Sequence, residues 1–216
     1  MHPRDQKSQR ICLWCLEALY HDATIFDLFL KRDICCQQCD QQLRSKRLIF
    51  DIGALSCEAH CIYDVHIERA LYRLKEDKDI AIATLFFKHA KIQLKRNKNS
   101  AHVLMPSSQD KIVERGFDHL HHMVKQHKLD IVDCLRKKDG WKQATKSKQD
   151  RKAIKQNIIL METERIKDKD VILVDDVCTT GSTLLTAYEL IKPHAKTVRA
   201  VVFAVHPIFY EDTKRL

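Results

Sequence analysis

The sequence predicts an α/β fold in which helices flank a parallel sheet, preceded by a small cysteine-rich module. Two observations support this prediction. Residues 171–205 read as an apolar strand, a helix and a second apolar strand, and two Cys-x-x-Cys pairs stand before residue 40. Strand, helix and strand in this order form a βαβ unit whose strands run parallel. A chain of 216 residues holds one ordinary domain plus such an appendage, but not two large domains.

The composition is that of a globular chain without membrane spans. Hydrophobic residues make up 44% and charged residues 31%, and no apolar run approaches the roughly 18 residues of a membrane helix. Residues 1–10 are polar and lack the apolar core of a secretory signal. We therefore expect a cytoplasmic protein, in which nine cysteines indicate metal ligands or free thiols rather than disulfides.

The two cysteine pairs have the spacing of a zinc site. Twenty residues separate Cys12-Leu-Trp-Cys15 from Cys36-Gln-Gln-Cys39, and four thiolates from two such pairs bind one zinc ion tetrahedrally. The expected ligands are Cys12, Cys15, Cys36 and Cys39, with Cys35 as the alternative to Cys36. A thioredoxin-like redox role is the first alternative, but neither pair lies between a predicted strand and a helix as that role requires. The second alternative is that the cysteines are buried and bind no metal.

The other cysteines do not supply a second complete set of ligands. Cys57 and Cys61 are separated by three residues and lack two further partners. They could only substitute into the first site. We therefore expect structural roles for Cys57, Cys61, Cys134 and Cys178.

The region between the cysteine module and residue 171 is mostly helical in pattern. Apolar residues at helical spacing in the range 63–94 predict two helices joined around residues 75–79. Residues 101–108 predict a short strand that ends at Pro106, and residues 115–127 predict another helix. Because its neighbouring histidines form no i, i+4 pair, we expect surface or packing roles for His119, His121 and His122.

Residues 136–155 are strongly basic. Nine lysines or arginines stand against two aspartates, and Trp141 lies among them. Cationic side chains bind the phosphates of nucleic-acid strands, and aromatic rings stack on bases. A solvated surface that only aids solubility is the alternative interpretation. The expected DNA contacts are Lys111, Arg115, Arg136, Lys137, Lys138, Trp141, Lys142, Lys146, Lys148, Arg151 and Lys152.

The stretch VILVDDVCTTGST, residues 171–183, has the parts of a phosphate site. Its apolar run predicts a buried parallel strand, and ligands of such sheets bind at the carboxyl ends of the strands. Amides at a helix start, together with hydroxyls, can surround a phosphate, and the glycine permits close approach. The aspartates would repel phosphate but suit the hydroxyls of an attached ribose. We predict a sugar 5-phosphate site made of Asp175, Asp176, Thr179, Thr180, Gly181, Ser182 and Thr183.

This stretch resembles the phosphoribosyl-pyrophosphate signature of type I phosphoribosyltransferases. A P-loop is excluded because no lysine follows the glycine, and a dinucleotide fingerprint needs further glycines. An ordinary strand-to-helix turn is the alternative. A zinc module ahead of such a domain resembles the layout of ComF-type competence proteins of bacteria. Residues 114–120, ERGFDHL, resemble that family's Arg-Gly-Phe-Asn-Gln motif, with Asp118 and His119 in place of Asn and Gln.

The resemblance implies a zinc module over residues 1–60 and a type I phosphoribosyltransferase-like domain over residues 61–216. It also implies a role in natural transformation, in which the protein handles incoming single-stranded DNA in the cytoplasm beside a ComF-type helicase partner. Zinc is then structural, and membrane association occurs only through partners. The rival hypothesis is an active phosphoribosyltransferase that uses magnesium, phosphoribosyl pyrophosphate and an unknown base, with residues 105–108 as its pyrophosphate loop. A zinc-tethered scaffold is the third hypothesis.

Overall fold

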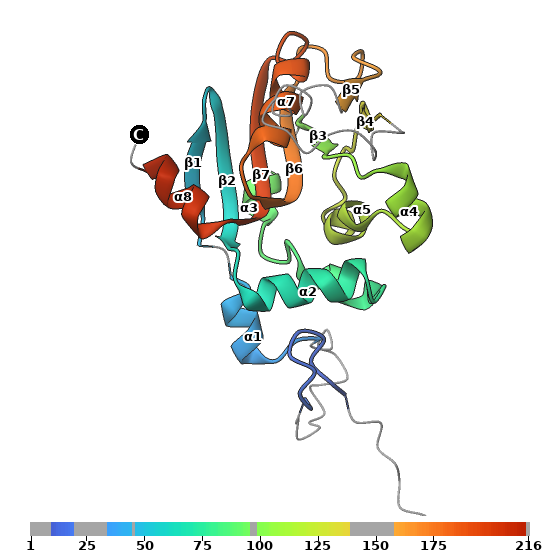
Figure 1. Cartoon of the computed structure of the whole chain (residues 1–216), viewed down its shortest axis with the longest axis vertical. Coiled ribbons are helices and arrows are strands. Elements are labelled where there is room, and N and C mark those ends of the chain that lie inside the picture. Colours follow the sequence, from blue (N-terminus) through green and yellow to red (C-terminus); the bar gives the residue numbers. More distant parts are fainter. Residues whose placement is uncertain (1–9, 20–33, 45, 96–98, 139–157, 215–216) are drawn as a thin grey trace, which may run out of the picture.

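A five-stranded sheet forms the centre of the protein (Figure 1). The computed structural model describes residues 10–19, 34–44, 46–95, 99–138 and 158–214. The strand order is β1-β2-β7-β6-β3, in which β2, β7, β6 and β3 run parallel and β1 pairs antiparallel with β2. The strands are β1 (Leu48–Ile52), β2 (Leu55–Ile62), β3 (Ala101–Leu104), β6 (Asp170–Cys178) and β7 (Thr197–Val205). The predicted parallel sheet is confirmed.

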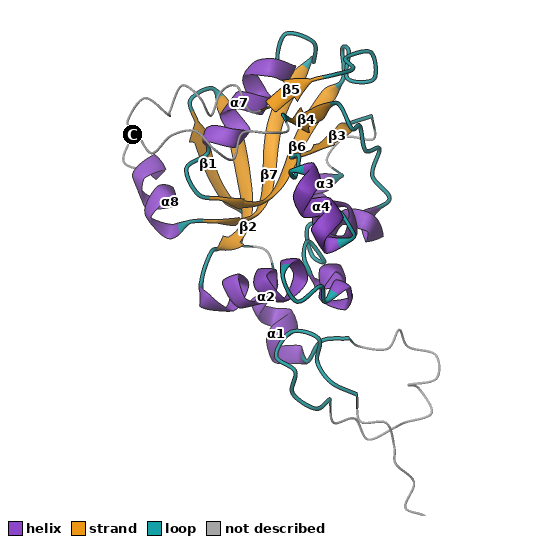
Figure 2. Ribbon diagram, turned by 45° about the vertical axis from the view of Figure 1, so that its right-hand side comes forward, coloured by secondary structure: helices purple, strands orange, loops and turns teal. Residues whose placement is uncertain are grey.

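The predicted βαβ unit consists of β6, the helix α7 (Ser182–Ile191) and β7, which are adjacent in the sheet. Val171 to Val174 are all buried, as expected of a strand covered on both faces. Helix α7 buries Leu184, Ala187 and Ile191, one face of a 3.6-residue repeat, against β6 and β7. The helix lies against the sheet in both ribbon views (Figures 1 and 2).

The 11-residue helix α2 (Val65–Lys75) begins where the sequence predicts a helix. The Asp64 side chain accepts hydrogen bonds from the amides of His66 and Ile67, both at 2.9 Å, which satisfies two donors at the helix start. Ile67, Ala70, Leu71 and Leu74 form its buried face.

The prediction of a second helix after residue 79 was only partly correct. Residues Ile80–Leu85 form a 3₁₀ helix, η2, and a short α-helix, α3 (Lys91–Leu94), follows. The aromatic rings of Phe86 and Phe87 both pack on Phe203 of β7, with ring centroids 4.8 Å and 5.5 Å apart. Because adjacent residues of an α-helix point in different directions, placing both rings in one core interrupts the helix. Phe87 accordingly has a φ of 54°.

The remaining elements complete the edge of the sheet. Helix α4 (Gln109–Arg115) ends at Gly116, whose φ is 87°, and α5 (His119–Val124) begins after Asp118, which accepts from the Leu120 amide. A short 3₁₀ helix, η3 (Lys125–His127), continues α5. Strands β4 (Leu135–Lys137) and β5 (Ile158–Leu160) form a separate antiparallel pair, and α8 (Pro207–Lys214) packs against β1.

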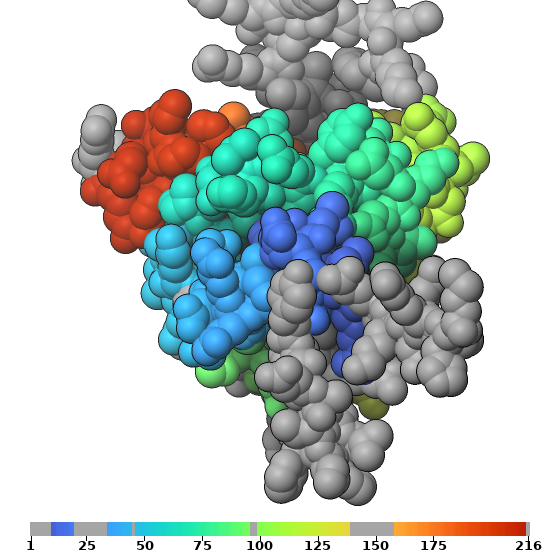
Figure 3. All heavy atoms as spheres, turned by 90° about the horizontal axis from the view of Figure 1, so that it is seen from below, coloured from blue at the N-terminus to red at the C-terminus, as the bar shows by residue number. Residues whose placement is uncertain are grey.

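The cysteine module lies beneath α2, on the side away from most of the sheet (Figure 1), and contains the helix α1 (Gln37–Gln42). Seen from below, residues 10–19 and α1 pack beside α2 (Figure 3). The boundary expected between residues 60 and 61 lies inside β2, which pairs with β7 from Ser56 to Ile62. The β1–β2 hairpin is therefore part of the sheet. Within the described residues, no helix is long and apolar enough to cross a membrane.

We expect Gly181→Ala to lower the free energy of unfolding by about 1–3 kcal/mol, the usual cost of overpacking a well-packed site. Gly181 has a φ of +69°, and an added Cβ would lie 2.5 Å from Ile52 Cδ1 and 3.1 Å from the Phe209 ring. Chemical denaturation measures the change, and Thr180→Ala, at the exposed neighbouring residue, is the control. Equal stability of the two variants would show that the loop is not held against Ile52.

Candidate functional site

A cavity of about 250 Å³ opens at the carboxyl edge of the parallel sheet. Residues Met105 to Ser108, directly after β3, form one wall, and Asp175 and Asp176 of β6 form another. The cationic side chains that line it are Lys75, Lys111, Arg115 and Lys137. Four cationic side chains against two carboxyl groups make this cavity suited to an anionic ligand.

The Asp176 side chain, which lines the cavity, is bonded to three partners. One carboxylate oxygen, Oδ2, accepts a hydrogen bond from His119 Nε2 at 3.0 Å and forms an ion pair with Lys75. The other oxygen, Oδ1, accepts from the Val177 amide at 2.7 Å. Asp176 is only 7% exposed, so these contacts are largely shielded from water.

Arg115 orients the His119 ring on its other side. Its Nη1 lies 3.2 Å from His119 Nδ1, and its Nε donates to the carbonyl oxygen of Lys75 at 2.9 Å. A guanidinium group has only donors, so Nδ1 accepts and the ring hydrogen sits on Nε2, from which it is donated to Asp176. Helices α2, α4 and α5 are thereby connected to β6 through side chains.

The two aspartates have opposite shifts of pKa. Burial alone raises the pKa of Asp176, but the His119 hydrogen bond and the Lys75 charge outweigh burial and hold this pKa below its usual range. Burial raises the pKa of Asp175 well above its usual range, and the negative charge of Asp176 raises it further. The site therefore favours the charged form of Asp176 and disfavours the charged form of Asp175.

The predicted phosphate loop follows β6 directly. The Cys178 carbonyl accepts from the His206 amide at 2.9 Å, which ties the loop to the end of β7. Thr180 Oγ1 and Ser182 Oγ lie 2.9 Å apart, and both residues are exposed, as is Thr179. Thr183 lines the same cavity as the aspartates. The predicted phosphate loop thus reaches the cationic cavity through Thr183.

The residues expected to contact DNA lie in different surroundings. Lys111 and Lys137 line the cavity, and Arg136 and Lys138 are exposed nearby in sequence. Arg115 is 8% exposed and bonded to His119 and to Lys75, so it acts inside the cavity wall. The other expected contacts lie outside the described residues: Trp141, Lys142, Lys146, Lys148, Arg151 and Lys152.

Two residues of this site, Lys75 and His119, were not predicted as functional. His119 was expected on the surface or in packing, but it is 6% exposed and bonded to Asp176. Its position in the motif of residues 114–120 was the sequence feature that could have indicated a functional role. Lys75 had no such signal, because it ends a helix whose charged residues mostly face solvent.

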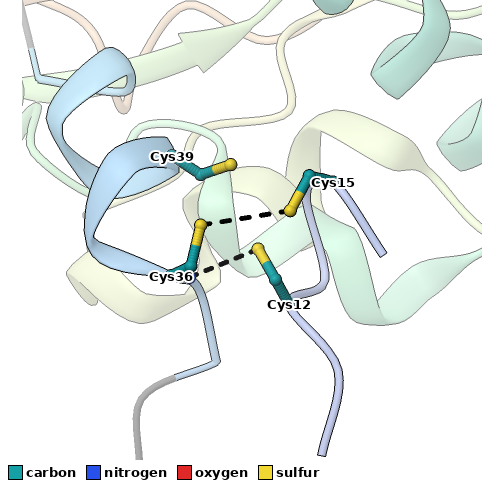
Figure 4. Close-up of side chains that lie close together, drawn as sticks. All are labelled: Cys12, Cys15, Cys36 and Cys39. Atoms are coloured by element: carbon teal, nitrogen blue, oxygen red, sulfur yellow. Dashed lines mark hydrogen bonds between the residues drawn. The ribbon is translucent and has the colours of Figure 1, made fainter. Parts of the chain in front are cut away.

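The four expected metal ligands meet in the N-terminal module (Figure 4). The sulfur atoms of Cys12, Cys15, Cys36 and Cys39 all lie within 4.8 Å of one another, and the Cys15 and Cys36 sulfurs are 3.9 Å apart. Four ligands at about 2.3 Å from a tetrahedral zinc ion have sulfur atoms about 3.8 Å apart. The donor set and its spacing therefore fit a structural zinc ion.

Backbone amides favour the thiolate form of Cys12, whereas burial raises the pKa values of Cys15 and Cys39. Burial raises the pKa of Cys12, but amides including that of Cys36, whose nitrogen lies 3.3 Å from the Cys12 sulfur, lower it to about 6. Cys35 is adjacent, with its sulfur 4.0 Å from that of Cys12. Burial raises the pKa of the Cys35 thiol to about 12. The cluster uses Cys36, and Cys35 points into the core.

Side-chain contacts of Arg73 and Asp40 attach the module to the larger domain. Arg73 of α2 donates through Nη1 to the carbonyl oxygens of Leu13 and Trp14, at 2.9 Å and 3.1 Å. Asp40 of α1 forms ion pairs with Lys88 and His89.

The remaining cysteines are buried in the core, and burial raises the pKa of each thiol. They are Cys57, Cys61, Cys134 and Cys178.

Comparison with known proteins first defines the class. Residues 122–214 match the family described as the phosphoribosyl transferase domain. The solved structures that match include adenine phosphoribosyltransferase from Saccharomyces cerevisiae, at 15% identity over 84% of this chain and 95% of that chain, with a TM-score of 0.41. A hypoxanthine-guanine phosphoribosyltransferase from Bacillus anthracis matches at 15% identity over 60% and 72%, with a TM-score of 0.40. The fold is phosphoribosyltransferase-like, with a four-cysteine cluster at its N-terminal side.

A more particular relative is the competence protein ComFC of Streptococcus pneumoniae. It is 23% identical over 205 residues, which cover 84% of this chain and 93% of that protein. The chain is therefore ComFC-like, with a phosphoribosyl transferase domain and an N-terminal four-cysteine cluster. This agrees with the resemblance drawn from the sequence.

We expect Cys36→Ser to lose most of its zinc, whereas Cys35→Ser keeps about one zinc ion per chain. The four sulfur atoms that lie within 4.8 Å of one another include that of Cys36, whereas the buried Cys35 is not part of this group. Metal analysis of the purified proteins measures this difference. Zinc loss from Cys35→Ser alone would assign the fourth ligand to Cys35, and a zinc-free wild type would contradict the assignment of the whole site.

We expect Asp176→Asn to lower the free energy of unfolding at pH 7 by about 3 kcal/mol, because the partly buried Lys75 loses its counter-charge. Asp175→Asn is the matched control and costs less, because burial and the neighbouring Asp176 charge disfavour the charged form that this substitution removes. Because the folded pKa of Asp176 lies below the unfolded value of about 3.9, its stabilisation is complete above that pH and is lost as the pH falls through the folded pKa. Denaturation at pH 7 and pH 3 measures both effects, and equal losses for the two variants would contradict this pairing.

Proposed function

We propose that this protein is an accessory protein of natural transformation that handles incoming single-stranded DNA in the cytoplasm. The observation on which this rests is the similarity to a competence protein, ComFC, over 84% of this chain, together with the four-cysteine cluster and the match to the phosphoribosyl transferase domain. A ComF-type helicase is the expected partner, and any membrane association passes through such partners. Structural zinc, held by the four cysteines, fixes the module against α2.

The cavity supports this function through its charge. Lys111 and Lys137 approach it from α4 and β4, which are separate elements, and the hydroxyl-rich loop 179–183 borders it. A DNA strand presents a repeating phosphate charge to such side chains, and its binding weakens as salt rises because counterions are released. The exposed Arg136 and Lys138 extend the positive charge beyond the cavity.

An active phosphoribosyltransferase is the second candidate. The match to the phosphoribosyl transferase domain and the adjacent aspartates on β6 favour it. The phosphate loop would then bind the ribose 5-phosphate, and residues 105–108 would face the departing pyrophosphate, with magnesium supplying positive charge there. Release of pyrophosphate from phosphoribosyl pyrophosphate and a nucleobase, abolished by Asp175→Ala, would establish this function instead.

We expect the double variant Lys111→Ala, Lys137→Ala to bind a single-stranded oligonucleotide about tenfold more weakly at low salt. The slope of log affinity against log salt should fall by about 0.7 for each lysine removed. The control, Lys192→Ala with Lys196→Ala, removes the same charge at the opposite end of the sheet, where β7 begins. Fluorescence anisotropy at several salt concentrations measures both.

Equal affinity for the two double variants would contradict a role of this cavity in DNA binding. A wild type that shows no binding at low salt would contradict DNA handling altogether. Competition by phosphoribosyl pyrophosphate with magnesium, in the same titration, tests whether the DNA and the sugar phosphate share the cavity.

A further inference from the structure

We infer that Lys75 and His119 determine sugar specificity: by engaging Asp176, they leave the site able to accept 2-deoxyribose 5-phosphate as well as ribose 5-phosphate. This inference rests on the proposed sugar-phosphate site and goes beyond it, because it names the sugar. The 5′ end of a DNA strand then becomes a ligand that the cavity accepts.

Most acceptor positions on the Asp176 carboxylate are already occupied by protein groups. A carboxylate has two oxygens with about four acceptor positions in total. Oδ2 is taken by Lys75 and by His119 Nε2 at 3.0 Å, and Oδ1 accepts the Val177 amide at 2.7 Å. About one position remains for a ligand.

Asp175 does not replace what Asp176 lacks. Its Oδ1 accepts the Asp176 amide at 2.9 Å. Burial and the like charge of Asp176 raise its pKa, which disfavours the charged form that is the stronger acceptor. Two adjacent sugar hydroxyls, as in ribose, would need two strong acceptors facing them. The site provides acceptors suited to a single hydroxyl.

A ribose hydroxyl gains little by displacing Lys75. The side chains of Asp176 and Lys75 are 11% and 27% exposed, and separating a partly buried ion pair leaves both charges without compensation. His119 is also held in place, because Arg115 occupies its Nδ1. Once the 3-hydroxyl, which both sugars carry, takes the one remaining position on Asp176, the 2-hydroxyl that distinguishes ribose finds no vacant strong acceptor.

The positive charges of the cavity serve the phosphate instead. Lys111 and Lys137 line the cavity without belonging to the bonded group around Asp176. A ligand held mainly by its 5-phosphate and little by its sugar hydroxyls binds equally well with either sugar. This division of roles separates phosphate affinity from sugar selectivity, so the two can be tested independently.

The test compares adenosine 5′-monophosphate with 2′-deoxyadenosine 5′-monophosphate by isothermal titration calorimetry on the full chain. We expect the two dissociation constants to agree within about threefold for the wild type. Lys75→Met frees an acceptor position on Asp176, so the ribonucleotide should gain about tenfold over the deoxyribonucleotide, the value of one hydrogen bond to a charged group. The control, Lys111→Met, removes a charge from the same cavity, and should weaken both nucleotides without changing their ratio.

His119→Ala is the second variant, because it frees the other acceptor position on Oδ2 should Lys75→Met fail to fold. It should shift the ratio in the same direction. A wild type that prefers the ribonucleotide by tenfold or more would overturn the inference while leaving the sugar-phosphate site intact, as would ratios unchanged in both folded variants. Binding of neither nucleotide to the wild type would overturn both the inference and the proposed site.

Discussion

The bonded group around Asp176 is the constraint on which the site depends. Lys75 comes from the end of α2 and His119 from the start of α5, and both reach a carboxylate in β6. The paired charges are shielded from water, so separating them is costly. This group therefore holds the end of α2 and the start of α5 against β6, and its three side chains line the cavity at the carboxyl edge of the sheet. The same bonds that stabilise the fold decide which acceptors a ligand meets.

The cysteine cluster is connected to this site through α2. Arg73 binds the backbone of the first cysteine pair, and Lys75, two residues later, pairs with Asp176. Trp14 also packs edge-on against Phe86, whose ring contacts Phe203 of β7. A zinc ion in the cluster would hold two short segments that have little core of their own. Through α2 and Phe86, the module supports the floor of the cavity.

The two aspartates show how one environment produces two different acids. They are adjacent in sequence, yet only Asp176 faces Lys75 and His119. Asp175 has burial and a like charge beside it, so its pKa rises while that of Asp176 falls. These local charges decide how the proposed sugar-phosphate site would bind its sugar.

The sequence by itself determined the features that depend on local spacing. The Cys-x-x-Cys pairs, the βαβ unit around the phosphate loop and the first helix after residue 63 follow from periodicity and short-range chemistry. Tertiary structure decided what depends on distant contacts. Examples are the interruption of the second helix by Phe86 and Phe87, the place of the β1–β2 hairpin in the sheet, and the meeting of Lys75 and His119 at Asp176. Such partners are far apart in the chain, so no local pattern records them.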